Sequence, residues 1–525
     1  MGSLDIGMNG ALLGAVAPWV SAFFGPLWII GTGALLGLLG LLAIWGISFV
    51  LSRSYAAAAA EVAWEAPLRA ILATASIMSL MGLVGFALVK DPGDILASLS
   101  RIRAVGTQTY EVKVPLVADA ETIATTWKLP QPLFGDELRE LEITSNEPLL
   151  VEAVDDDFGK FTWRKEVESG LPFLWSPRRD VTNPFRGEKV ESLVVTNQGQ
   201  SEAQIRLTVH TGLKYHEVMA IPITAVGLVL IVLAYFLLRV LAPKVSAIAL
   251  ATTKSEMSQP LFALLMVATA FLLWLFLYIP YHTFNEDIKM LKDSGLTLIM
   301  IVCIFQAIWA GSTSVADEIE GRTAMTVLSK PIGRRQFVLG KFLGIAWLVV
   351  VMFIILGTFF LGVVSYKVLY DSREMTYKPM EESSAGSVGM QEPTWRDCHA
   401  EAVMTVPGLV LAFMEAIVLT SISVAISTRL PLLANLVIVF AIYAAGHLTP
   451  LLVQSGAGQL ETVDFIAQLI AVIFPVLDHF NIQTAVASRI PVPLPYLGWA
   501  LVYCLTYTTT VLLLALALFQ DRDLA

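Results

Sequence analysis

Apolar runs recur along almost the whole chain, separated by short polar connections. A helix needs roughly 20 predominantly apolar residues to cross a hydrocarbon core about 30 Å thick. Nine runs come close to or meet this length, so we expect an α-helical polytopic membrane protein. The predicted transmembrane helices are Leu27–Leu51, Leu68–Val89, Val218–Leu238, Leu261–Ile279, Leu296–Ser314, Gly340–Val364, Val406–Ile426, Leu432–Leu452 and Leu497–Phe519.

Four less regular segments accompany these spans. Residues 1–24 are moderately apolar and predict an extracytoplasmic or interfacial lead-in, or a re-entrant helix. Pro243–Gln259 predicts an amphipathic helix in the membrane interface, which Pro260 separates from the next span. Phe465–Leu477 is short for a span and contains a proline, so a re-entrant or interfacial hairpin is expected. Tyr366–Ala402 is polar and predicts an extracytoplasmic loop. The apolar residues on one face of the amphipathic helix are Val245, Ile248 and Ala249.

One sizeable polar region, residues 90–216, interrupts the apolar pattern. Four of its runs are β-rich or alternate between apolar and polar positions, which is typical of strands. Asn197–Gln200 predicts a turn, and hence a hairpin between the last two runs. A region of this size with these strands predicts a small, sandwich-like β-rich domain. The four runs are Thr109–Val117, Leu138–Val154, Val190–Thr196 and Ala203–His210.

The middle of this region, Asp155–Gly187, is rich in aromatic residues and prolines. Aromatic side chains at this density fill a small core or bind a ligand, and both alternatives stay open. The aromatic residues concerned are Phe158, Phe161, Trp163, Phe173, Trp175 and Phe185.

Composition agrees with a membrane protein. Hydrophobic residues make up 56% of the chain and charged residues only 15%, and the mean hydropathy is +0.70. The net charge of −10 does not suggest a nucleic-acid-binding protein. The three cysteines show no spacing typical of a disulfide framework or a metal site, so no metal is expected.

A charged strip, Val315–Gly344, lies between two predicted spans. Its acidic residues precede a short predicted helix, Thr323–Ser329, where negative charge favours a helix N-terminus. Pro331 and Gly333 then break this helix. Five basic residues place the strip in the cytoplasm by the positive-inside rule. They are Arg322, Lys330, Arg334, Arg335 and Lys341.

The order of residues in this strip resembles the cytoplasmic loop of the ABC type-2 (ABC-2) permease family. The matching positions read Glu-x-Glu-Gly-x-Thr, then Leu, then Lys-Pro-Ile-x-Arg and Gly-Lys. The resemblance implies that the loop carries a coupling helix, which docks on a separate ATP-binding subunit. The resemblance covers about residues 253–525, so it does not explain the N-terminal half. The residues that it assigns to coupling are Glu318, Glu320, Gly321, Arg322, Thr323, Leu328, Pro331, Arg334, Gly340 and Lys341.

The resemblance also implies a function and partners. The chain would be the transmembrane permease subunit of an ATP-binding-cassette transporter, usually an exporter, with a second permease core as homodimer or heterodimer. Its own sequence has no GxxxxGK[ST] phosphate loop, since Gly340–Lys341 is followed by Phe342 and lacks the upstream glycine. We therefore expect no catalytic site or cofactor in this chain, and ATP and Mg²⁺ in a partner ATPase.

A cytoplasmic strip fixes the remaining topology by parity. The C-terminus is then cytoplasmic, and residues 90–216 and the N-terminus are extracytoplasmic, in an expected bacterial inner membrane. The predicted organisation has five parts. Residues 1–89 contain the lead-in and two transmembrane helices, residues 90–216 form the β-rich domain, and residues 217–242 form the third transmembrane helix. Residues 243–260 form the interfacial helix, and residues 261–525 form a six-helix permease core that includes the strip 315–344.

Glu415 is the exception among the apolar helices. It lies near the middle of Val406–Ile426, where an ionised side chain is costly. Its two readings are a pathway or gating residue and a neutral, hydrogen-bonded packing residue. His447, towards the outer end of the next span, is expected to be interfacial. The string Asp397–His399 with Glu401 is a weak pattern for a metal site in a predicted loop.

Two other functions are compatible with this sequence. The added N-terminal domain suits an ATPase-coupled membrane scaffold or envelope-assembly factor, which performs mechanical work on an outside partner. Glu415 suits a proton-coupled secondary transporter, which needs no ATPase.

Overall fold

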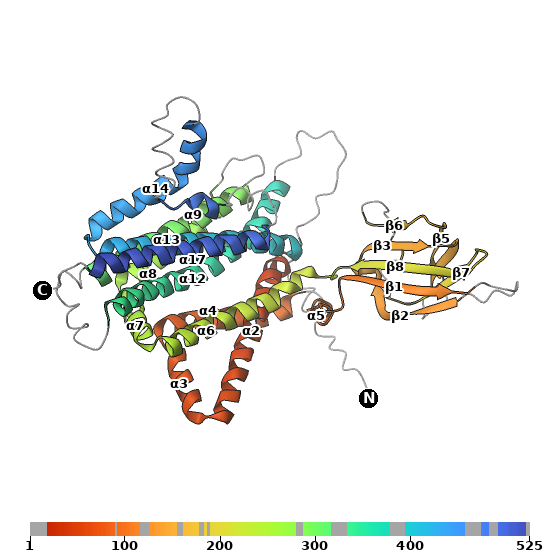
Figure 1. Cartoon of the computed structure of the whole chain (residues 1–525), viewed down its shortest axis with the longest axis horizontal. Coiled ribbons are helices and arrows are strands. Elements are labelled where there is room, and N and C mark those ends of the chain that lie inside the picture. Colours follow the sequence, from red (N-terminus) through yellow and green to blue (C-terminus); the bar gives the residue numbers. More distant parts are fainter. Residues whose placement is uncertain are drawn as a thin grey trace. The chain divides into compact units, whose positions relative to one another are not determined.

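The computed structural model describes two compact units, one helical and one rich in strands (Figure 1). The first unit comprises residues 1–90 with 220–525, and the second residues 91–219. The described residues are 18–89, 92–115, 125–154, 161–177, 183–185, 189–279, 287–316, 333–377, 394–456, 474–481 and 492–520. The two units are taken separately below.

The helical unit contains a helix at each of the nine predicted spans. Seven helices among the described residues are long and apolar enough to cross a membrane, and α7 with α8, bent by 65°, makes up to eight. The ninth, α14, counts as a shorter apolar helix. The helices are α2 (Pro18–Leu51), α3 (Arg53–Ala63), α4 (Ala66–Leu88), α6 (Ala220–Leu241), α7 (Pro243–Met257), α8 (Pro260–Phe276), α9 (Asp287–Gly311), η3 (Ser312–Ala316), α12 (Arg334–Tyr377), α13 (Trp395–Ser427), α14 (Leu432–Gly456), η4 (Leu477–Phe480) and α17 (Leu494–Gln520). The predicted polytopic helical fold is thus confirmed.

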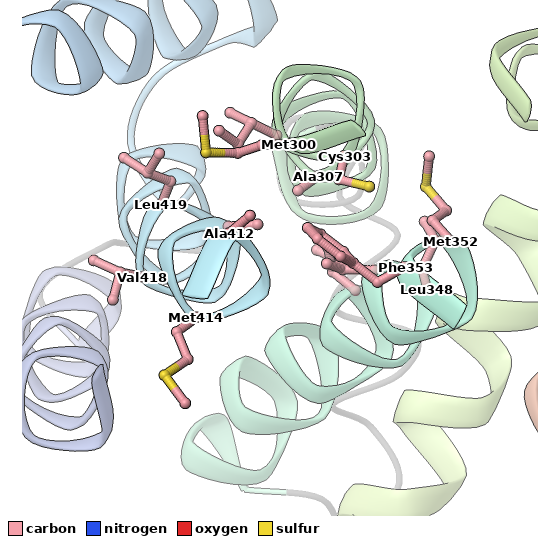
Figure 2. Close-up of a cluster of buried hydrophobic side chains, with 14 of the residues drawn as sticks. Met300, Cys303, Ala307, Leu348, Met352, Phe353, Ala412, Met414, Val418 and Leu419 are labelled. Atoms are coloured by element: carbon pink, nitrogen blue, oxygen red, sulfur yellow. The ribbon is translucent and has the colours of Figure 1, made fainter. Parts of the chain in front are cut away.

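The core of this unit forms where α9, α12 and α13 meet. The most apolar stretch of α13 is 72% buried, and those of α9 and α12 are each 61% buried. The corresponding stretch of α2 is only 11% buried, as expected for a helix that faces lipid on most sides. Figure 2 shows the centre of this core, where the ring of Phe353 of α12 lies between α9, which carries Cys303, and α13, which carries Ala412.

The first and second long helices, α2 and α4, cross with their backbones in direct contact. A Cβ atom placed on Gly31 would lie 2.3 Å from the carbonyl oxygen of Met78 and 2.7 Å from the Cα of Gly82. Neither glycine can therefore carry a side chain without moving the two helices apart. Small residues serve the same purpose in many membrane helix pairs, because close backbones maximise van der Waals contact.

The predicted loop Tyr366–Ala402 is wrong at both ends. The helix α12 continues to Tyr377, and α13 already begins at Trp395. Residues 378–393, and residues 465–473 of the predicted hairpin Phe465–Leu477, lie outside the described residues. Similarly, α2 begins at Pro18, so the last residues of the predicted lead-in belong to the first helix.

Polar partners explain why these helices extend past the apolar runs. Lys367 Nζ donates to the carbonyl of Leu277 at 3.3 Å and pairs with Asp371, one turn later, at 2.9 Å. At the start of α13, Lys292 of α9 pairs with Glu401 at 2.5 Å, and both side chains are buried. Charged residues at these positions predict a loop, but Lys367 and Glu401 are buried, paired groups inside helices.

The strand-rich unit is a sandwich of two four-stranded antiparallel sheets, which confirms the predicted β-rich domain. One sheet has the strand order β1-β8-β3-β6, and the other has the order β2-β7-β4-β5. A short helix, α5 (Pro92–Ser100), precedes them. The strands are β1 (Thr107–Val114), β2 (Thr125–Phe134), β3 (Leu138–Ser145), β4 (Leu149–Val154), β5 (Phe161–Val167), β6 (Phe173–Trp175), β7 (Lys189–Asn197) and β8 (Ala203–Thr211).

The predicted hairpin between the last two strands is wrong. β7 pairs with β2 and β4, whereas β8 pairs with β1 and β3, so Asn197–Gln200 leads from one sheet to the other. The predicted strand Leu138–Val154 likewise divides into β3 and β4, which lie in opposite sheets. Alternating patterns fix which face of a strand is buried, but they do not say which neighbour a strand pairs with.

Two of the connections that pass between the sheets, β3–β4 and β7–β8, are bonded to each other. The side-chain oxygen of Asn146 accepts a hydrogen bond from the backbone of Gln204 at 2.6 Å. Its amide group donates to the carbonyl of Glu202 at 3.3 Å, and Ser201 donates to Glu147 at 2.6 Å. These bonds join the two sheets at one end of their inner strands, which we call an edge of the sandwich.

The described aromatic residues of the Asp155–Gly187 segment fill the core of the sandwich. Trp175 and Phe185 are 4% and 1% exposed, and Trp163 and Phe173 pack against the same cluster. Of the two readings, the structure supports the core, since Trp175 and Phe185 are buried and the partly buried Trp163 and Phe173 pack against the same cluster.

Replacing Asn146 with Ala should loosen this edge. The variant removes both side-chain bonds of Asn146, which lie at the surface, at a cost of about 0.5–1.5 kcal/mol. We expect hydrogen exchange of the amides of Ala203–Ile205 to accelerate about tenfold in the full-length protein. Gln198→Ala is the matched control, because Gln198 is exposed in the neighbouring connection. Equal exchange in the two variants would contradict the role given to Asn146.

Candidate functional site

The structure describes the two ends of the charged strip but not its middle. Residues 317–332 lie outside the described residues. The predicted coupling residues in that stretch are Glu318, Glu320, Gly321, Arg322, Thr323, Leu328 and Pro331. The other three, Arg334, Gly340 and Lys341, lie in the first turns of α12.

The chain enters the strip through an irregular helix end. The last turn, η3, has the wider π-type hydrogen bonding, which often marks a functional position in a helix. Asn435 of α14 fixes this turn, because its amide nitrogen lies 3.0 Å from the hydroxyl of Ser312. The same nitrogen lies 3.0 Å from Ser423 and 2.8 Å from Ser427, both on α13. Three elements are thus tied together by one buried amide.

Within the strip, α12 begins at Arg334, which holds the end of α17. Its guanidinium donates to the carbonyl of Gln520 at 2.6 Å and to that of Phe519 at 3.4 Å. A cation here satisfies C-terminal carbonyls that have no partner within the helix. Phe337, one turn into α12, stacks on Phe519 with ring centres 5.6 Å apart. The start of α12 and the end of α17 therefore form one contact.

Gly340 and Gly344 bring α12 against α7. A Cβ atom on Gly340 would lie 2.6 Å from the Cβ of Ile248, and one on Gly344 would lie 2.7 Å from the carbonyl oxygen of Ala249. Thr253 closes the contact by donating to the carbonyl of Gly344 at 2.8 Å. This is the close approach that a glycine pair at this spacing permits.

The buried face of α7 is polar as well as apolar. Ile248 and Ala249 lie on it, but so do Ser246, Thr252, Thr253 and Glu256. An amphipathic helix lying on a membrane would bury a continuous apolar face. The polar groups of α7 are covered by other helices instead, and the periodicity of the sequence gave no sign of this.

These contacts surround a small polar cavity of about 240 Å³. Thr313 of η3 donates to Glu256 of α7 at 3.1 Å. Lys341 is 5% exposed, and its amine lies 5.6 Å from the ring centre of Phe337. We call this meeting point of η3, α7, α12 and α17 the strip junction.

A second polar cluster lies within the helices. Glu415 is 2% exposed, and its carboxylate lies 2.8 Å from the Nε2 of His447 on α14. Both side chains line a cavity of about 290 Å³, together with Tyr443. His447 was predicted to be interfacial, and its pairing with Glu415 was not anticipated. The two residues are 32 positions apart, so no local spacing indicates the pair.

The residues of the weak metal pattern, Asp397–His399 with Glu401, include two carboxylates that bind other side chains or backbone groups. Asp397 accepts hydrogen bonds from the backbone and hydroxyl of Thr394 and so caps α13. Glu401 pairs with Lys292. No group of three or more metal-ligating side chains occurs among the residues that the structure describes.

A family model described as ABC-2 family transporter protein matches residues 223–524. The chain belongs to the ABC-2 transporter family. It is an integral membrane protein and a permease of this family, and the predicted resemblance is confirmed. A search of curated proteins finds no match.

The ABC-2 region begins earlier than the resemblance suggested. It starts within α6 and so includes α7, whereas the sequence pattern indicated a start near Thr253. The strip junction therefore lies entirely inside the family region, with all four of its elements. The helices α2–α4 and the strand-rich unit precede this region of the permease.

Arg334→Gln should free the end of α17. The variant removes a charge-assisted bond to the last carbonyls, worth about 1–2 kcal/mol. We expect hydrogen exchange in Leu516–Gln520 to rise several-fold. Arg335→Gln is the control, because Arg335 is exposed at the next position. If both variants exchange alike, Arg334 does not hold α17.

Gly344→Leu should separate α7 from α12. The added side chain overlaps the backbone of α7, and overpacking of this kind costs about 1–3 kcal/mol. We expect a fall of several degrees in the thermal midpoint of the purified protein. Gly362→Leu on the same helix is the control, since a Cβ there meets no atom within 4 Å. An equal fall in both variants would contradict the close α7–α12 contact.

Proposed function

We propose that this ABC-2 permease is driven by a separate ATPase subunit, which docks on the strip 315–344. The absence of a phosphate-binding loop from the sequence supports an external source of energy. The observation that carries the proposal is the strip junction, because Arg334, the residue of the strip at which α12 begins, bonds directly to α17.

The junction suits the transmission of movement. A displacement of the strip acts on the start of α12, which is fixed to α17 by Arg334 and to α7 by Gly340 and Gly344. These helices would move together rather than singly, because close packing resists independent displacement. ATP and Mg²⁺ bind in the partner, and the residues of this chain receive the movement.

The proposed orientation follows from charge. Arg334, Arg335 and Lys341 lie at the strip end of α12, which supports a cytoplasmic position for the strip junction. The C-terminus is then cytoplasmic, the strand-rich unit extracytoplasmic, and the membrane a bacterial inner membrane. Export is the proposed direction, through a complex of two permease cores and two ATPases.

The strand-rich unit favours a second candidate, an ATPase-coupled scaffold or envelope-assembly factor. This unit is a compact sandwich with its own core, and a separately folded domain suits contact with an outside partner. The two candidates share the docked ATPase. They differ in whether a substrate stimulates ATP hydrolysis, which is expected for a transporter and not for a scaffold.

Co-purification tests the shared part. We expect an ATPase to co-purify with the wild-type permease, and to be lost when Glu320→Lys is combined with Gly321→Pro, because charge reversal and a broken backbone disrupt the docking surface. Glu202→Lys, an exposed change in the strand-rich unit, should retain the ATPase. Retention by the double variant, or no ATPase with the wild type from membranes that contain candidate partners, would overturn the proposal.

A further inference from the structure

The cavity that contains Glu415 and His447 has the composition of a binding site for a cation. It lies among α9, α13, α14 and η4, and its volume of about 290 Å³ accommodates a small organic molecule. Met300 of α9, drawn in Figure 2, and Phe480 of η4 supply apolar walls.

The charge of the cavity is set by Glu415. Among the described residues that line it, Glu415 is the single acidic one, and none is Lys or Arg. The hydrogen bond that Glu415 accepts within the described part of the chain comes from His447, to one carboxylate oxygen. A buried carboxylate needs a positive partner, since an uncompensated charge is costly inside a membrane. With His447 neutral, the cavity therefore attracts a positive charge.

Aromatic rings surround the same space. Tyr443 lines the cavity and packs edge-on to His447, with ring centres 4.8 Å apart. Phe480 lines another part of the wall and is 3% exposed. Aromatic faces attract cations through their quadrupole, and quaternary ammonium groups are the ligands most often bound in this way.

We propose that this cavity binds a small organic cation, with the carboxylate of Glu415 as counter-ion and Tyr443 and Phe480 against its alkyl groups. The ammonium takes the place that the His447 ring occupies as partner of Glu415. An anion is disfavoured because the carboxylate lies at the most buried point. A neutral molecule of the same shape has no positive charge to pair with the carboxylate of Glu415, so it binds more weakly.

Binding at this cavity is independent of the ATPase, whereas its use as a transport site rests on the proposed function. The test therefore uses the purified full-length permease in nanodiscs, without any ATPase. Titration calorimetry compares choline, its neutral analogue 3,3-dimethylbutan-1-ol, and the anion 3,3-dimethylbutanoate. Choline and the neutral analogue share one shape and differ in charge, and the anion keeps the branched alkyl group but carries a carboxylate in place of the hydroxymethyl group.

We expect saturable binding of choline, and binding of both analogues at least about tenfold weaker, the change that about 1.4 kcal/mol produces. Glu415→Gln should weaken choline binding by at least about tenfold. His447→Gln should bind choline at least as tightly as the wild type does, because it removes the competing partner. Thr420→Val, buried on the same helix and outside the cavity lining, should bind choline normally.

Three results would overturn the inference: no saturable choline binding by the wild type, equal binding of the neutral analogue, or full choline binding by Glu415→Gln. The His447→Gln variant is the control for misfolding, because a collapsed cavity would abolish choline binding in both Glu415→Gln and His447→Gln. Loss in both, with unchanged thermal midpoints, also counts against Glu415 as the counter-ion. Choline binding without a co-purifying ATPase would leave this inference standing and remove the proposed function.

Discussion

Buried charges in hydrocarbon require partners, and the helical unit of this permease is tied together by such pairs. Lys292 on α9 pairs with Glu401 on α13, and Glu65 between α3 and α4 binds both Tyr235 and Arg239 of α6. Each pair joins helices that are far apart in the sequence. Removing one partner of the buried Lys292–Glu401 pair would leave an uncompensated charge, at a cost of several kcal/mol. Packing of apolar faces alone does not specify so strictly which helix lies beside which.

The same pairs explain what the sequence could and could not predict. A helix lies at each of the nine predicted spans, because a bilayer demands about 20 apolar residues whatever the neighbours are. The ends of α12 and α13 were missed, since Lys367 and Glu401 resemble loop residues until their distant partners are known. The pair of Glu415 with His447 was missed for the same reason. Strands were found by alternation, but the pairing of β7 and β8 depends on long-range contacts.

The helix α12 begins at the strip junction and extends far beyond it. The helix α12 contains 44 residues, which is about 66 Å at 1.5 Å per residue. A bilayer with its headgroup regions is about 40–45 Å thick, so α12 is longer than the membrane is wide. It starts at Arg334, and near its far end Lys367 bonds to the end of α8. A rigid element of this length can link the two sides of the membrane without any intermediate.

The pairing of the first strand with the last has a consequence for biosynthesis. Thr107 of β1 lies opposite His210 of β8, and β8 also joins β1 to β3. The sheet β1-β8-β3-β6 therefore cannot close until about a hundred further residues have been made, which takes several seconds at roughly 5–20 residues per second. During that interval β1 has an unpaired edge, a form prone to aggregation. The nascent permease thus has a window in which a chaperone for exposed strands would be useful.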